Sequence, residues 1–213
     1  MSVNKKSLSE RDICTQFITP AVQKSGWDFA TQVREEFYFT AGQVIVKGKV
    51  VRRGKPKKAD YLLFYRPHIP IAIIEAKRND KPLGAGMQQG LEYANEDALA
   101  IPFVFSSNGD GFLFHDKTRT GPAVETELTL DQFPSPAKLW NRYCQWKEFD
   151  SAAEQIVTRE YYSDGSDKSP RYYQQNAINR TVEAIATGQD RALLVMATGT
   201  VTTCSITSIA RHA

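Results

Sequence analysis

Three charged residues stand at the ends of two short apolar runs, and together they could hold a divalent cation. Glu75 and Lys77 close the run that begins at Ile71, whose β-branched residues predict a buried strand. Side chains alternate across a strand, so Glu75 and Lys77 would point to the same face, ~6–7 Å apart along the backbone. Asp60 precedes a second run over 61–65, and the turn-like link over 66–70 predicts antiparallel pairing. That pairing would bring Asp60 beside Glu75.

Such a grouping suits metal-assisted chemistry on a phosphate. Carboxylate oxygens are hard ligands of the kind that Mg²⁺ prefers, and a lysine can orient an attacking water or offset charge on the phosphate. The alternative is that Glu75 and Lys77 form a minor ion pair at a solvated strand end. The spacing is short, and by itself it does not decide between these two interpretations.

The composition is that of a globular chain without a membrane span. Its 213 residues are enough for one or two domains, and no apolar run approaches the ~20 residues that a membrane span needs. The N-terminus lacks the apolar segment of a signal peptide. The cysteines at 14, 144 and 204 are scattered, which argues against a disulfide framework and a zinc site and favours the cytoplasm.

The net charge of +3 is small, but the basic residues are concentrated just before Asp60. Lys55, Lys57 and Lys58 are the last members of this group, which begins at Lys47. A run of this kind is usually a solvated loop, although beside a metal site it would also attract a nucleic-acid backbone.

Hydrophobic periodicity predicts an α/β layout around these residues. The pattern indicates a helix over 7–24 that kinks or breaks at Pro20, strands over 33–39 and 43–51, and the strand pair described above. A helix over about 86–97 carries Gln89 and Tyr93 on one face, and further strands follow over 101–107 and 112–115. The candidate site would then lie on one edge of a central sheet.

The character of the chain changes after about residue 120. We expect a domain over 1–120, a connector and linker over 121–168, and the beginning of another domain over 169–213. The last part predicts a helix over about 171–187 that closes at Gly188, and then a strand over 191–196.

With these motifs in hand, the chain resembles the N-terminal part of the motor and nuclease (R) subunit of type I restriction enzymes. The resemblance extends in order over about 200 residues. It is carried by the segments 9–20, 26–28, 59–61, 74–77, 89–94, 106–109, 133–136 and 171–175.

The resemblance implies a PD-(D/E)xK nuclease core of the RecB-like branch, with a central mixed sheet flanked by helices. Asp60 and Glu75 would hold Mg²⁺, and Lys77 would orient the water or stabilise the scissile phosphate. Gln89 and Tyr93 match the Q-x-x-x-Y pattern of that branch, which sets a polar pair over the metal site. Glu10 would correspond to the first-helix acid of such nucleases and is a further candidate ligand.

The C-terminal part resembles the start of the family's helicase motor. Tyr173 and Gln174 would correspond to a motif that contacts the adenine of ATP. After residue 200, where the family continues with Gly-Lys-Thr, this chain has Val-Thr-Thr and no further lysine. We therefore expect a motor domain truncated at its P-loop, a final dozen residues unlike the family, and ATP binding only in full-length members.

The resemblance implies an Mg²⁺-dependent endonuclease domain that cleaves double-stranded DNA without reading its sequence. In the family, a specificity subunit reads the site, methyltransferase subunits join the complex, and ATP-driven translocation precedes cleavage. The alternative is a non-catalytic DNA-binding or assembly module of the same complex, and the isolated fragment could lack activity. No membrane partner is expected.

Overall fold

The computed structural model describes residues 4–40, 44–47, 50–53, 56–95, 98–160 and 170–194. The chain divides into two compact units, Met1–Tyr143 and Cys144–Ala213, and the division falls within helix α4 (Pro136–Lys147). The first unit contains the sheet and every residue of the candidate site. None of the helices in the described ranges is long and apolar enough to cross a membrane.

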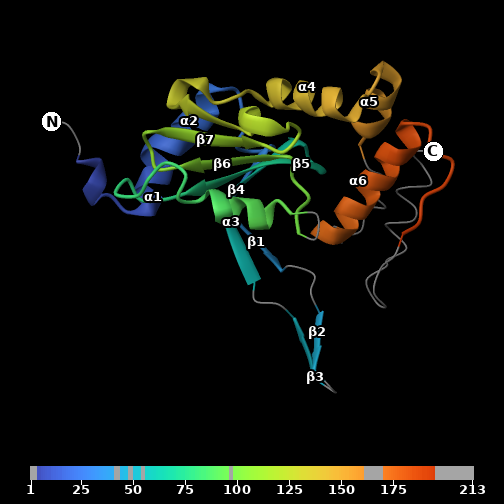
Figure 1. The fold of residues 1–213 in the computed structure, drawn as a ribbon, viewed down its shortest axis with the longest axis horizontal. Coiled ribbons are helices and arrows are strands. Elements are labelled where there is room, and N and C mark those ends of the chain that lie inside the picture. The colour runs from blue at the N-terminus through green and yellow to red at the C-terminus, as the bar shows by residue number, and fades with distance from the viewer. Residues whose placement is uncertain are drawn as a thin grey trace. The chain divides into compact units, whose positions relative to one another are not determined.

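A six-stranded sheet organises the first unit (Figure 1). Its strands lie in the order β1-β4-β5-β6-β7-β8, and every neighbouring pair is antiparallel except β5 with β6. Their bounds are β1 Val33–Thr40, β4 Pro56–Arg66, β5 Ile69–Ala76, β6 Phe103–Ser107, β7 Gly111–Asp116 and β8 Glu125–Thr129. The predicted α/β class and the antiparallel pairing of β4 with β5 are confirmed.

The one parallel pair requires a crossover connection, which residues 77–102 supply. This connection contains α3 (Met87–Tyr93), which packs against β5 and β6 and is shorter than the helix predicted over 86–97. It ends early because the carbonyls of its last turn are taken up by non-helical hydrogen bonds, with Leu99 N–H donating to Tyr93 O and Ile101 N–H to Ala94 O.

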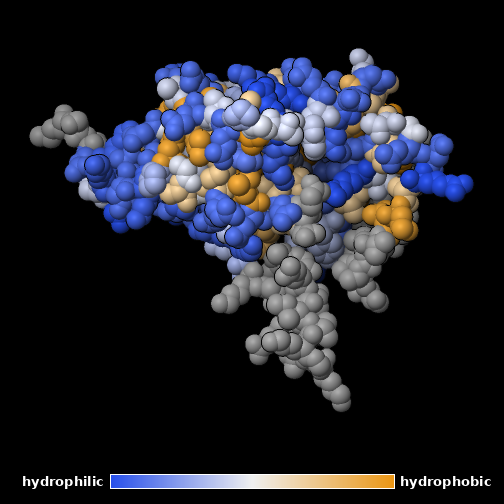
Figure 2. Space-filling view, in the orientation of Figure 1, coloured by the Kyte–Doolittle hydropathy of each residue, from blue (hydrophilic) through white to orange (hydrophobic). Residues whose placement is uncertain are grey.

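The core lies on the central strands because their apolar runs are covered on both faces. Ile71, Ile73 and Ile74 of β5 are fully buried, as are Phe103 and Phe105 of β6. Figure 2 shows the complementary pattern outside, since mainly hydrophilic residues cover the face in view, with scattered apolar patches.

The N-terminal helix is interrupted before its proline. It consists of α1 (Glu10–Ile13), a π-helical segment η2 (Cys14–Ile18) and α2 (Thr19–Lys24), preceded by the 3-10 turn η1 (Lys5–Ser7). Ser9 caps α1, because its hydroxyl accepts the N–H of Asp12, whose carboxylate accepts the N–H of Ser9. Pro20, which has no N–H to donate, follows directly on the π-helical segment, where Thr19 N–H bonds to the carbonyl of Cys14 five residues back.

Two predicted positions are wrong. The strand over 43–51 is replaced by a separate two-stranded hairpin, β2 (Val44–Lys47) with β3 (Val50–Arg53). Asp60 does not begin its strand, because the basic segment extends β4 back to Pro56 through pairing with β1. The same pairing makes β4 internal to the sheet.

The remaining elements complete the two units. In the first, η3 (Gly121–Val124) and η4 (Leu130–Gln132) flank β8, and Trp140 of α4 stacks on Tyr65 with ring centroids 4.3 Å apart. In the second, α5 (Ser151–Val157) packs with α6 (Tyr172–Ala186). The bounds of α6 are close to those of the helix predicted over about 171–187. The strand predicted over 191–196 is wrong for residues 191–194, which are not in a strand. Residues 195 and 196 lie outside the described residues.

Candidate active site

Asp60 and Glu75 face each other on neighbouring strands. The last backbone pair of β4 with β5 at this end is Tyr61 with Ile74, and Asp60 and Glu75 are the next residues in the same register. Instead of a backbone pair, the Asp60 Oδ2 accepts the N–H of Ala76 at 2.8 Å. This hydrogen bond from β5 therefore fixes the Asp60 carboxylate beside Glu75.

Glu75 is buried without any hydrogen bond to its carboxylate. Its exposed fraction is 0%, and among the residues that the structure describes neither Oε1 nor Oε2 has a hydrogen-bond partner. Burial raises the pKa of Glu75 to about 9, and the negative charge of Asp60 adds to this effect. The charge of Lys77 and the backbone N–H of Asp60 oppose the shift and are weaker. That N–H is not placed to form a hydrogen bond with the carboxylate. An unpartnered carboxylate in a protein interior is costly, and a cation would relieve that cost.

Lys77 is the cation nearest to this carboxylate. Its Nζ lies 4.0 Å from Glu75 Oε2 and donates a 3.1 Å hydrogen bond to the side-chain oxygen of Gln89. The Gln89 amide in turn donates to the Tyr93 hydroxyl at 3.1 Å. Residues 77, 89 and 93 thus form a continuous chain of hydrogen bonds that fixes the ammonium beside Glu75.

Two glycines let α3 approach the buried carboxylate closely. A Cβ built on Gly86 would lie 2.8 Å from the Cβ of Glu75, and one on Gly90 would lie 2.6 Å from Val104 Cγ1. These contacts explain why glycine occupies the N-cap of α3 (Gly86) and a position inside the helix (Gly90), and how α3 brings Gln89 over the site.

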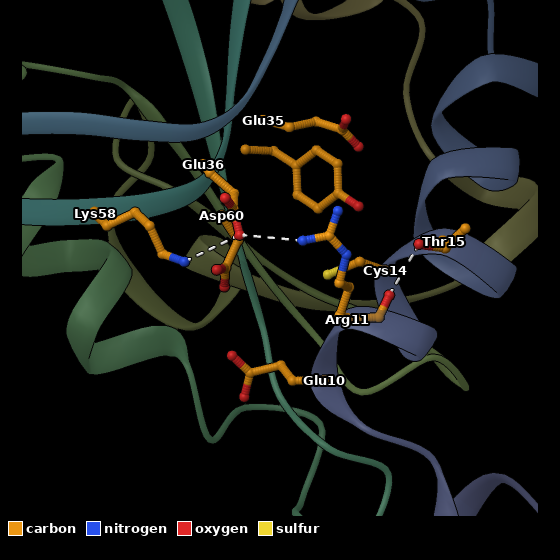
Figure 3. Close-up of a pocket in the computed structure, with 9 residues that line it drawn as sticks. Glu10, Arg11, Cys14, Thr15, Glu35, Glu36, Lys58 and Asp60 are labelled. Carbon is orange, nitrogen blue, oxygen red and sulfur yellow. Dashed lines mark hydrogen bonds and ion pairs between the residues drawn. The ribbon is translucent and has the colours of Figure 1, made fainter.

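Asp60 and Glu10 line a cleft of about 410 Å³ beside this site (Figure 3). Burial raises the pKa of Asp60, although its bond from Ala76 and the charge of Lys77 oppose the shift. Burial also raises the pKa of Glu10, and the charges of Lys77 and Asp60 act on it, so the α1 acid faces the same site.

The donor set fits a cation that keeps part of its own hydration. Within the described ranges, no three His, Cys, Asp or Glu side chains converge closely enough to form a complete metal cage. Mg²⁺ does not need one, since it is commonly bound through one or two carboxylates together with waters and substrate phosphates. Asp60 and Glu75 meet that requirement, whereas the role of Glu10 as a further ligand stays a prediction.

The basic residues before Asp60 do not act alike. Lys57 pairs with Glu92 at 3.6 Å and lies over the Tyr93 ring at 5.2 Å, while Lys58 pairs with Glu36 at 3.1 Å at the cleft. Lys55 lies outside the described residues. The sequence did not single out Glu36 or Arg11, which also line the cleft, because their role depends on strand register and not on a local motif.

The predicted adenine-contacting residues lie in the second unit, at the start of α6. Gln174 is buried, and its side-chain oxygen accepts the N–H of Arg171, the N-cap of α6, as the N3 residue of a capping box. The Tyr173 ring meets that of Tyr172 edge-on at 5.5 Å. A contact of either residue with ATP stays a prediction.

Comparison with known proteins identifies the family. Residues 36–123, which include both candidate carboxylates on the sheet, match the family described as type I restriction enzyme R protein N terminus. The chain is 52% identical over 199 residues to the type I restriction enzyme EcoAI endonuclease subunit of Escherichia coli, covering 93% of this chain and 24% of that protein. The chain belongs to the R-protein family of type I restriction enzymes. Its resemblance to that family is thereby confirmed.

Two further R-protein relatives agree. The EcoKI endonuclease subunit of Escherichia coli strain K12 is 26% identical over an alignment of 181 residues, and the match covers 67% of this chain and 15% of that protein. A fragment structure assigned to an HsdR subunit from Vibrio vulnificus YJ016 superposes with a TM-score of 0.80 at 38% identity, over 96% of this chain and 38% of that one. The chain thus spans about a quarter of the length of the EcoAI subunit and less of the EcoKI subunit.

A second family match covers the other end of the chain. Residues 167–213 match the family described as type III restriction enzyme, res subunit. The match begins close to residue 169, where a second domain was expected. The domain bounds 1–120, 121–168 and 169–213 stay predictions.

Proposed function

We propose that this R-protein segment is a Mg²⁺-dependent endonuclease domain that hydrolyses DNA phosphodiesters. The observation that carries the proposal is the buried, unpartnered carboxylate of Glu75 between Asp60 and Lys77. A fold without a ligand at this position would be more stable with an apolar residue there. The family and the description of both Escherichia coli relatives as endonuclease subunits support the proposal.

The side chains have distinct roles in the proposed reaction. Asp60 and Glu75 hold Mg²⁺, which when bound offsets the negative charge that develops on the phosphate. Lys77 stabilises the scissile phosphate or orients the attacking water, and Gln89 holds the Lys77 ammonium in place through their 3.1 Å bond. Tyr93 anchors Gln89 in turn. In this proposal the cleft binds backbone phosphates and not base edges, which would make cleavage independent of local sequence.

In the assembled enzyme, the domain would act on double-stranded DNA together with methyltransferase and specificity subunits. Cleavage would follow ATP-driven translocation by the remainder of the R protein, of which residues 167–213 contribute the beginning. A cytoplasmic location stays a prediction from the cysteine usage.

A plasmid-nicking assay tests the proposal. Supercoiled plasmid is incubated with the chain and Mg²⁺, with EDTA as the metal-free control. We expect nicking that disappears in Glu75→Gln and Lys77→Ala and persists in Gln88→Ala, which changes an exposed neighbour of Gln89. Equal products from the wild type and the two site variants would contradict the proposal and favour a non-catalytic DNA-binding or assembly module.

A further inference from the structure

The cleft beside Asp60 holds two cations that the proposed reaction does not use. Arg11 of α1 and Lys58 of β4 approach the carboxylate of Glu36 from opposite sides (Figure 3). Lys58 Nζ lies 3.1 Å from Glu36 Oε1 and Arg11 Nη1 lies 4.0 Å from it. One carboxylate therefore holds two cations at the mouth of the candidate site.

Glu36 is held in an unfavourable backbone conformation at this point. Its φ of 49° lies in the left-handed region, which non-glycine residues seldom adopt. It lies across the sheet from Asp60, because Glu35 pairs with Tyr61 and Phe37 pairs with Ala59, and the pairing is interrupted between them. Strain of this kind persists where the surrounding structure fixes it, and it concentrates at functional sites.

The three side chains are open to solvent and their ion pairs are weak. The exposed fraction is 86% for the Arg11 side chain, 39% for Lys58 and 55% for Glu36. Exposed ion pairs contribute little stability, so another anion can replace the carboxylate at low cost. A DNA phosphodiester is such an anion, and the guanidinium of Arg11 matches its oxygens in geometry as well as in charge.

We propose that Arg11 and Lys58 form a clamp for a DNA backbone phosphate next to the scissile one, and that Glu36 occupies this clamp until DNA displaces it. Strand neighbours are about 5 Å apart, so a phosphate in the place of the Glu36 carboxylate lies close to one held at Asp60. Glu36 keeps the two cations positioned and lowers the affinity for DNA. This inference rests on the proposed DNA substrate.

Lys57 is excluded from the clamp although it precedes Lys58 in the chain. Its ammonium pairs with Glu92 and lies over the Tyr93 ring on α3, and it does not line the cleft. The basic segment therefore contributes one described lysine to the clamp, and the second cation comes from a distant part of the chain.

Binding of a fluorescein-labelled duplex, followed by anisotropy in EDTA over a range of salt concentrations, tests the clamp without hydrolysis. For Arg11→Ala and for Lys58→Ala we expect a roughly three- to tenfold loss of affinity. Each variant should also reduce the slope of log affinity against log salt concentration by ~0.9, because each loses one phosphate contact. Lys24→Ala removes an exposed, paired lysine away from the cleft and should leave both values unchanged.

A matched pair of variants separates the charge of Glu36 from its conformation. Asp and Asn both tolerate the left-handed region, but only Asp keeps the charge. We expect Glu36→Asn to bind the duplex roughly threefold more tightly than Glu36→Asp, and this difference should vanish in the Arg11→Ala/Lys58→Ala background. Circular dichroism checks that each variant is folded.

The outcomes distinguish the clamp from the nuclease proposal. Equal salt slopes for the wild type, Arg11→Ala and Lys58→Ala would overturn the clamp, as would absence of duplex binding or equal affinities of the Asn and Asp variants. If these variants behave as expected but Mg²⁺-dependent nicking is absent, the clamp stands and the nuclease proposal fails alone.

Discussion

The carboxylate of Glu75 lies 4.0 Å from the ammonium of Lys77, yet it receives no hydrogen bond from that group or from any other in the described part of the chain. Lys77 donates instead to Gln89. A buried carboxylate with a nearby but not directly bonded cation leaves its oxygens free to bind a metal. Burial of this carboxylate without a hydrogen bond also destabilises the fold. The site can therefore be tested by measuring stability as well as activity.

Stability without metal should decrease as the pH rises. The pKa of Glu75 is about 9 in the fold against an ordinary value of 4.5, so between these values the folded chain binds more protons than the unfolded chain. The free energy of unfolding therefore falls with rising pH through this window, by on the order of 3–5 kcal/mol between pH 4.5 and pH 7–8. Thermal melts in EDTA at pH 6 and pH 8.5 measure the effect.

Glu75→Gln should remove most of this pH dependence, because the amide does not ionise. At pH 8.5 the variant should melt at a higher temperature than the wild type in EDTA, and Mg²⁺ should stabilise only the wild type. A wild-type melting temperature that rises between pH 6 and pH 8.5, or an equally steep fall in Glu75→Gln, would refute the assignment of this effect to Glu75.

Gln89→Ala should slow nicking with little effect on metal binding. It removes the 3.1 Å bond that positions the Lys77 ammonium but leaves both carboxylates in place. We expect a roughly tenfold fall in the nicking rate, with Mg²⁺-dependent thermal stabilisation retained. Gln88→Ala, one residue earlier and exposed, is the control and should nick like the wild type. Equal rates for the two variants would show that Lys77 needs no support from Gln89.

Gly86→Ala should disturb the site more than Gly84→Ala. At both positions the new Cβ would meet an atom at 2.8 Å, but at Gly84 it is the end of the Leu113 side chain, whereas at Gly86 it is the Cβ of Glu75. The leucine can move and the strand cannot, so Gly86→Ala should cost about 1–3 kcal/mol of unfolding free energy and lower nicking. Urea denaturation compares the two, and a larger loss in Gly84→Ala would be contrary to this packing.

Trp140→Ala should destabilise the first unit without acting on the site directly. The indole is 1% exposed and stacks on Tyr65 at 4.3 Å. Loss of a buried tryptophan costs about 3–5 kcal/mol. At a temperature where the variant remains folded, its nicking rate per folded molecule should equal that of the wild type, measured after correcting for the folded fraction by circular dichroism.

The sequence predicted those parts of the structure that depend on local pattern. The apolar runs around Leu62 and Ile73 indicated their strands, and the short link between them indicated antiparallel pairing, both of which the structure contains. Gln89 and Tyr93 were expected on one face of a helix, and they are joined there by a hydrogen bond.

The parts that could not be predicted depend on distant partners. Pairing with β1 extends β4 through a basic segment that looks like a loop, and it makes the strand of Asp60 internal. The left-handed conformation of Glu36 has no signal in its residue type, because glutamate has no preference for that region. Arg11 approaches Lys58 only because α1 packs near this end of the sheet, as the lining of the cleft shows.

Crystals of the chain soaked in Mn²⁺ and measured near the manganese absorption edge would test the metal site most directly. We predict an anomalous peak ~2.1–2.2 Å from a carboxylate oxygen of Asp60 and one of Glu75, and loss of this peak in Glu75→Gln. A peak bound elsewhere, or a Glu75 carboxylate that stays without a ligand at saturating Mn²⁺, would contradict the proposed centre.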